Sequence, residues 1–273
     1  MAGTGHLRMA GNGDPCGAAH GLAVAMITTN TTLQLDTREN GPRGMSNGGF
    51  ASGTFAELVG GTATVSLDAK VPLGVPLTVT TTEDGAEVSA RGRRLATVRE
   101  TEPFVLQPPV RPTYDEAADA RDRHPLRGVR HPLSDCVVCG PERYDGLRVT
   151  PGPLVADGEV LAAPFLPTAR FAVAGEVRSA AVWGALDCPS YPAAALMRRR
   201  FCLLGTLEAH QVRPVTVGER LVVVGWTTGV GDRSTRTASA MIAEDGSVVA
   251  SARAVWVALR HQWAVRAVSR ITG

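Results

Sequence analysis

The residues of this sequence best suited to chemistry are one acid and a group of cysteines. Asp187 lies inside the apolar run 182–192 and is followed directly by Cys188. A buried carboxylate needs a partner or a task, because burial penalises its charged form or shifts its pKa. Two interpretations of Asp187 stay open: it ends a helix by binding a nearby backbone amide, or it has a functional role.

A second cysteine motif precedes this run. Cys136 and Cys139 have the Cys-x-x-Cys-Gly spacing of a zinc knuckle, in which the glycine lets backbone amides turn toward the thiolates. One such pair is a weak signal, and a tetrahedral ion needs further ligands from elsewhere, with His131 and Cys202 among the candidates. Three interpretations remain: a structural metal site, reduced thiols packed in the core, or a redox dithiol.

Two more stretches suit ligand binding. Asn47 is a plausible N-cap for a short helix over 50–59, and Gly48 and Gly49 leave backbone N–H groups approachable by a carbonyl oxygen or an anion. The basic run 198–200 is either a solvated helix end or a patch for ligand phosphates. No phosphate-binding glycine loop and no serine nucleophile elbow is found.

Strand and helix patterns indicate the elements that position these residues. The dense apolar residues of 180–187, few of them β-branched, favour a helix that ends at Asp187. A short charged helix is expected at 114–123. Strands are expected at 27–36, 62–69, 76–82, 86–91, 94–100, 147–151, 159–164, 202–212, 219–227, 234–243 and 247–259.

The two halves of the chain echo each other. The segment 70–77 resembles 213–221, and the turn 83–85 has the same residues, Glu-Asp-Gly, as the turn 244–246. An internal duplication explains this order. The resulting division is a poorly ordered N-terminus at 1–26, a first domain at 27–102, a proline-rich linker at 103–130, a second domain at 131–260 and a tail at 261–273.

Composition restricts the class of protein. The 273 residues are 44% hydrophobic and 20% charged. The net charge of +2 argues against a strong positive electrostatic field that would attract nucleic acid. No segment approaches the roughly 20 apolar residues of a membrane span, and the N-terminus lacks the pattern of a secretion signal. We therefore expect a cytoplasmic protein with no membrane partner.

Three motifs carry a resemblance to a known group. They are Cys136-x-x-Cys139-Gly140-Pro141, Asp145-Gly146-Leu147-Arg148 and Trp183-x-Ala185-Leu186-Asp187-Cys188-Pro189. In these motifs the sequence resembles an actinobacterial thioesterase-like group of the hotdog-fold superfamily, over roughly residues 27–260. The resemblance implies an α+β double hotdog, with two antiparallel sheets each wrapped around a central helix. It also makes Cys188 the best partner for Cys136 and Cys139 in a metal site.

The resemblance further implies roles for site residues. Asp187 resembles the helix-borne aspartate of type II acyl-CoA thioesterases and would activate water. Asn47 with the Gly48 and Gly49 amides would orient the thioester carbonyl, and Thr206 would supply a hydroxyl. Acyl tails would run beside Phe50 and Trp183. These enzymes also use a glutamine, and the comparable strand here reads Ser-Ala-Arg-Ala at 251–254.

Three functions follow as hypotheses. The first is hydrolysis of an acyl-CoA or acyl-carrier thioester, which requires no cofactor for catalysis and leaves a structural zinc open. The second is binding of an acyl ligand without catalysis, which the missing glutamine favours. The third is an enoyl-thioester hydratase or dehydratase, which ranks last. A double hotdog already contains the pair that single hotdogs form by dimerising, so either a monomer or a homodimer is reasonable.

Overall fold

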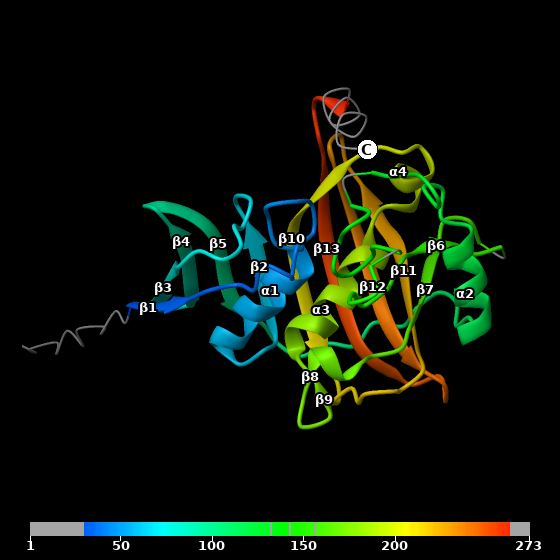
Figure 1. The fold of residues 1–273 in the computed structure, drawn as a ribbon, viewed down its shortest axis with the longest axis horizontal. Helices are drawn as coiled ribbons and strands as arrows, with labels where there is room; N and C mark the ends of the chain where they lie inside the picture. The colour runs from blue at the N-terminus through cyan, green and yellow to red at the C-terminus, as the bar shows by residue number, and fades with distance from the viewer. Residues whose placement is uncertain (1–29, 132, 142, 156, 263–273) are drawn as a thin grey trace, which may run out of the picture.

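A computed structural model describes residues 30–262, apart from 132, 142 and 156. Its main feature is an antiparallel sheet of 11 strands in the order β1-β3-β4-β5-β2-β10-β13-β12-β11-β7-β6 (Figure 1). The strands of the first half are β1 Asn30–Leu33, β2 Ala63–Leu67, β3 Leu77–Thr82, β4 Gly85–Ala90 and β5 Arg93–Glu100. Those of the second half are β6 Gly152–Pro153, β7 Leu161–Phe165, β10 Cys202–Gln211, β11 Leu221–Val230, β12 Ser234–Ala243 and β13 Val248–Ala258. β8 Ala172–Val173 and β9 Glu176–Val177 form a separate small hairpin.

The helices differ in what they cover. α1 Gly48–Ala56 and α3 Ser179–Asp187 lie side by side on the concave face of the sheet, one for each half (Figure 1). α2 Tyr114–Asp122 packs on the other face, where Ala117 and Ala120 join a second apolar cluster with β7, β11 and β12. A short α4 Ala193–Met197 and three 3₁₀ turns, Glu57–Val59, Ala169–Phe171 and Cys188–Ser190, complete the order.

The α+β double hotdog is confirmed, with one change to the predicted sheets. The strand order β1-β3-β4-β5-β2 is repeated as β7-β11-β12-β13-β10, and each half wraps one central helix. The two halves are not separate sheets, because β2 pairs with β10 from Thr206 opposite Ser66 to Ala209 opposite Ala63. Pairing these two edge strands satisfies backbone groups that separate sheets would expose.

The repeat itself is confirmed by this topology, but one predicted equivalence is wrong. The segments 70–77 and 213–221 do occupy matching places. The first leads from β2 into β3, and the second leads from β10 into β11, the counterparts of β2 and β3 in the second half. The two Glu-Asp-Gly turns do not match. The turn 83–85 joins β3 to β4, whereas 244–246 joins β12 to β13, the counterparts of β4 and β5.

The two central helices approach each other unusually closely. A Cβ added at Gly49 would lie 2.8 Å from the Gly184 Cα, and one added at Gly184 would lie 2.6 Å from the Phe50 ring. Only glycine lets backbones come this near, since any side chain would force the helices apart. This contact brings the first turn of α1 against the last turn of α3.

Most predicted elements are found within a residue or two of their expected bounds. The predicted strand at 147–151 is absent, and the chain there forms a loop before the two-residue β6. The expected N-terminal segment, 1–26, lies outside the described residues, and so do residues 263–273 of the expected tail, 261–273. Across the described part of the chain, no helix has the length and apolar character needed to cross a membrane.

Candidate functional site

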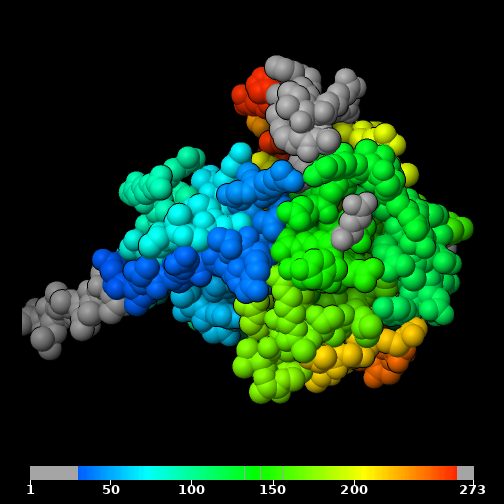
Figure 2. Space-filling view, in the orientation of Figure 1, coloured from blue at the N-terminus to red at the C-terminus, as the bar shows by residue number. Residues whose placement is uncertain are grey.

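A hollow lies where the two halves of the chain meet. It has a volume of about 590 Å³ and is bounded by the loop before α1, the cysteine loop, the end of α3 and the start of β10. In the space-filling view the blue segment before α1 meets the green cysteine-loop region along this boundary (Figure 2). All three predicted cysteines line this hollow, together with Asn47, Gly48 and Asp187.

Asp187 is fixed at the inner end of this cavity. It is the last residue of α3 and only 2% of its surface is exposed. Its Oδ2 accepts hydrogen bonds of 3.0 Å from Asn47 Nδ2 and 3.1 Å from the Gly49 amide. Its Oδ1 is buried and has no hydrogen-bond partner among the described residues. The carboxylate is therefore held through one oxygen, and the other has no described partner.

Burial dominates the ionisation of this acid. Desolvation raises the pKa of Asp187 to about 7, and the nearby Cys136 adds to the rise. The hydrogen bonds from Gly49 and Asn47 act in the opposite direction, because they stabilise the charged form.

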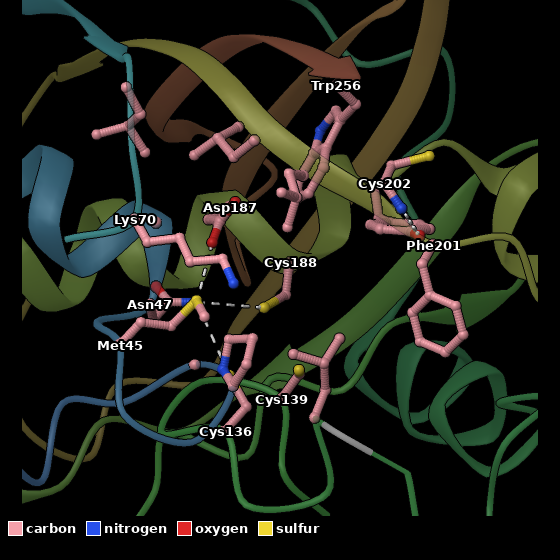
Figure 3. A pocket seen from close by; sticks show the side chains of 18 of the residues that line it. Met45, Asn47, Lys70, Cys136, Cys139, Asp187, Cys188, Phe201, Cys202 and Trp256 are labelled. Carbon is pink, nitrogen blue, oxygen red and sulfur yellow. Dashed lines mark hydrogen bonds between the residues drawn. The ribbon is translucent and has the colours of Figure 1, made fainter. Parts of the chain in front are cut away.

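Asn47 has two functions in the structure. Its Oδ1 accepts from the Phe50 amide at 2.9 Å, so it is the predicted N-cap of α1. Its Nδ2 donates to Asp187 and also lies 3.7 Å from Cys136 Sγ and 3.9 Å from Cys188 Sγ (Figure 3). Asn47 and the Gly49 amide were predicted to orient a substrate carbonyl, and in the structure both donate to Asp187.

The three predicted cysteines come together. The Sγ atoms of Cys136, Cys139 and Cys188 all lie within 4.8 Å of one another, Cys136 being buried and the other two partly buried. In Figure 3 these side chains converge below Asp187. Asp187 and Cys188 both line the same cavity.

Hydrogen bonds favour a thiolate at one of these positions. The thiols of Cys139 and Cys188 and the backbone amides of Cys139 and Val138 lower the pKa of Cys136 well below its usual range. The same shared hydrogen bonds with Cys136 raise the pKa of Cys139 and of Cys188.

The cysteine loop is fastened to the loop before α1 by residues that the sequence did not single out. Asn40 Nδ2 donates to the Asp135 carbonyl at 2.8 Å, and the Val137 amide donates to the Asn40 carbonyl at 2.7 Å. Arg143 donates to the Asn40 side chain and pairs with Asp145 at 2.7 Å. The one sign of this network in the sequence is that Arg143 lies two residues before Asp145, the first residue of the Asp-Gly-Leu-Arg motif.

Thr206, predicted to supply a hydroxyl, is not brought to Asp187. It lines a separate hollow on the outer face of the sheet. The reason is a β-bulge at Gly205, where the register with β13 shifts. The extra residue puts Leu204 and Leu207 on the inner face and turns Thr206 outward.

Phe50 and Trp183, expected beside an acyl tail, are also elsewhere. They are 0% and 1% exposed and belong to the solid core between the helices and the sheet. The apolar part of the cavity is lined by Met45, Leu133 and Leu204 instead.

Exposed cations surround the cavity. Two of the three arginines in the basic run, Arg199 and Arg200, line it, as do Lys70 and Arg93 from the first half. Lys70 was not predicted, although the repeat aligned it with Arg213. Arg213 is instead paired with Glu219 at 2.5 Å.

The polar lining differs from the hydroxyl and glutamine pair that the resemblance implies. Among the described residues of the cavity, the hydroxyl groups are those of Ser46 and Tyr191, and no glutamine is present. Ser46 Oγ donates to the Asn47 carbonyl at 3.1 Å, and Tyr191 Oη donates to the Arg200 carbonyl at 2.5 Å. Both hydroxyl groups therefore already donate hydrogen bonds to backbone carbonyls.

Comparison with known proteins supports the fold. No family model and no curated protein matches the sequence. Among solved structures, a candidate thioesterase II from Thermobifida fusca YX is similar, with 15% identity, a TM-score of 0.55, and 85% of this chain and 92% of that chain covered. A conserved protein of unknown function with a hot dog fold, from Alicyclobacillus acidocaldarius, has 12% identity, a TM-score of 0.48, and 84% and 93% coverage. The chain is thus a hotdog-fold protein in which the fold is present twice.

Proposed function

We propose that this protein binds an acyl thioester in the cavity and hydrolyses it, with Asp187 as the group that activates water. The observation that carries the proposal is the state of Asp187, a residue that lines the cavity: its buried carboxylate is fixed through Oδ2 by Asn47 and Gly49, and its Oδ1 is buried without a described partner. A carboxylate held in one position in a residue that lines a cavity suits general base catalysis, because a general base must lie within hydrogen-bond reach of the proton that it removes.

In this mechanism Oδ1 of Asp187 takes a proton from a water molecule. The water oxygen attacks the thioester carbonyl carbon, the carbon–sulfur bond breaks, and the departing thiolate receives the proton from Asp187. The products are a carboxylic acid and a free thiol. Gly48, the first residue of α1, lines the cavity, and its backbone N–H at the positive end of the helix would polarise the carbonyl oxygen.

The cations support a phosphorylated carrier. Lys70, Arg93, Arg199 and Arg200 are exposed at the cavity, whereas the acids of its described lining are Asp68 and Asp187. The nucleotide phosphates of coenzyme A, or an acidic carrier protein, would complement this excess of positive charge.

The test is cleavage of acyl-CoA esters of graded chain length, with free coenzyme A detected by chromatography so that the protein's own thiols do not interfere. We expect turnover by the wild type, and a loss of about 100-fold or more in kcat for Asp187→Asn. Asp119→Asn is the matched control, because Asp119 is exposed on α2. Full activity in Asp187→Asn would exclude Asp187 as the base.

One observation favours a second function, binding without catalysis. The described cavity has no glutamine, and its two hydroxyl groups are bound to backbone carbonyls. This alternative predicts calorimetric binding of an acyl-CoA with no release of free coenzyme A over any chain length.

A further inference from the structure

The three cysteines form a compact set of soft donor atoms. Cys136 and Cys139 come from one loop and Cys188 from the residue after α3, and their Sγ atoms lie within 4.8 Å of one another. Around a tetrahedral zinc ion with bonds of about 2.3 Å, sulfur atoms are separated by roughly 3.8 Å. The cluster therefore needs only small side-chain movements to surround an ion.

The loop geometry holds two of the donors together. Gly140 is required at the turn, because a Cβ there would lie 2.6 Å from the carbonyl oxygens of Ser134 and Cys136, and its amide donates to the Cys136 carbonyl at 2.9 Å. This turn keeps Cys136 and Cys139 on one loop with the two-residue spacing that zinc sites use.

A second observation points to a ligand at the same place. Oδ1 of Asp187 is buried without a described partner, and Asp187 lines the cavity beside the thiols. A buried polar atom without a partner costs about 1–3 kcal/mol, so such an atom calls for a water, an ion or a substrate.

A fourth protein ligand is not part of the cluster. Among the described residues, the group of metal-binding side chains within reach contains the three cysteines alone. His131 lines the same cavity, but its Nδ1 accepts from the Leu133 amide at 3.3 Å. All three thiols line the cavity, so the remaining side of the cluster faces space that a small ligand can enter.

We propose that Cys136, Cys139 and Cys188 bind one divalent zinc ion, whose fourth coordination position opens onto the cavity and accepts an exogenous ligand. Three thiolate ligands select a soft or borderline ion such as zinc over magnesium or calcium. Three protein ligands with one open position are the arrangement of zinc sites that bind water or substrate. This inference does not depend on thioester hydrolysis.

The first experiment uses the full chain, purified under reducing conditions without chelators. Elemental analysis should find one zinc per chain. After removal of the metal, titration with cobalt(II) should give one ion per chain, with thiolate-to-cobalt charge-transfer absorption and the visible bands of tetrahedral geometry. Added coenzyme A, whose thiol can occupy the open position, should shift the visible bands. No charge-transfer absorption with excess cobalt would overturn the site, and bands unmoved by coenzyme A would overturn its open position.

Variants identify the ligands. Cys139→Ser and Cys188→Ser should weaken zinc binding by more than the roughly 10–100-fold that loss of a supporting residue costs. Cys202→Ser is the matched control, because Cys202 is a partly buried free cysteine outside the cluster. His131→Gln should bind zinc like the wild type. Loss of binding in His131→Gln would make the site a closed four-ligand one and overturn the open position.

A measurement on the wild type alone guards against variants that fail to fold. Bound zinc should protect Cys136, Cys139 and Cys188 from alkylation, as mapped by mass spectrometry, while Cys202 is modified at the same rate with and without metal. Equal modification of the three cysteines with and without zinc, or a disulfide between two of them in the purified protein, would contradict the proposal.

Discussion

The Gly49 amide donates a hydrogen bond of 3.1 Å to Oδ2 of Asp187, so the start of one central helix touches the end of the other. A Cβ at position 49 would lie only 2.4 Å from the Asp187 Cβ. The same small residue therefore sets both the helix contact and the position of the acid.

Gly49→Ala should destabilise the fold and displace Asp187. Overpacking at a tight core contact costs about 1–3 kcal/mol. Denaturant unfolding would show a lower midpoint with an unchanged slope. Gly158→Ala is the control, because nothing lies within 4 Å of a Cβ added there, and its effect should stay within about 0.5 kcal/mol. Equal midpoints for the two variants would contradict the close helix contact.

Substitutions of Asn47 should separate its two functions. Asn47→Ala loses both the cap of α1 and the donor to Asp187, and its missing cap should cost about 0.5–2 kcal/mol of unfolding free energy. Asn47→Ser retains a capping hydroxyl but not the amide donor. We expect Asn47→Ser to have an unfolding free energy close to that of the wild type. Both variants should have a reduced kcat, because each lacks the amide donor to Asp187. If Asn47→Ser restored both properties, the donor to Asp187 would have no role.

Charge at the cavity should affect recognition of the carrier rather than chemistry. Arg200→Ala should raise KM for an acyl-CoA about two- to fivefold, the effect of one exposed ion pair, with little change in kcat. The corresponding acyl-pantetheine, which lacks the nucleotide phosphates, should show no such change. Arg198→Ala is the matched control, since Arg198 is exposed but does not line the cavity. A similar rise in KM for both substrates would argue against phosphate binding.

His124 should make stability depend on pH. Burial lowers the pKa of His124 below its usual 6.5, and its ring lies 2.7 Å from the Pro151 carbonyl. A depressed folded pKa means that the neutral ring contributes stability above pH 6.5, and that this contribution is lost as the pH falls through 6.5 toward the folded value. His124→Gln retains a donor for that carbonyl but does not titrate. The unfolding free energy should fall less between pH 7 and pH 5 in this variant than in the wild type, and identical curves would refute the prediction.

Much of this protein could be predicted from its sequence. The apolar periodicity of 180–187, the alternation of the long strands and the Asn-Gly-Gly start of α1 are local patterns, and the elements appear where these patterns predicted them. The duplication was also visible, because 70–77 and 213–221 share a local order of basic, proline and glycine residues. The paired Glu-Asp-Gly turns misled, since such turns are favoured at any hairpin.

What the sequence alone determined was thus the list of reactive residues and the elements that carry them. The tertiary structure decided which of those residues meet. The bulge at Gly205 placed the Thr206 side chain on the outer face of the sheet. Close packing of α1 on α3 brought the Asn47 and Gly49 N–H groups within hydrogen-bond distance of Asp187. The tertiary structure also brought Cys188 together with a loop about 50 residues earlier. Side-chain direction depends on register and helix contact, which are long-range properties that local patterns do not contain.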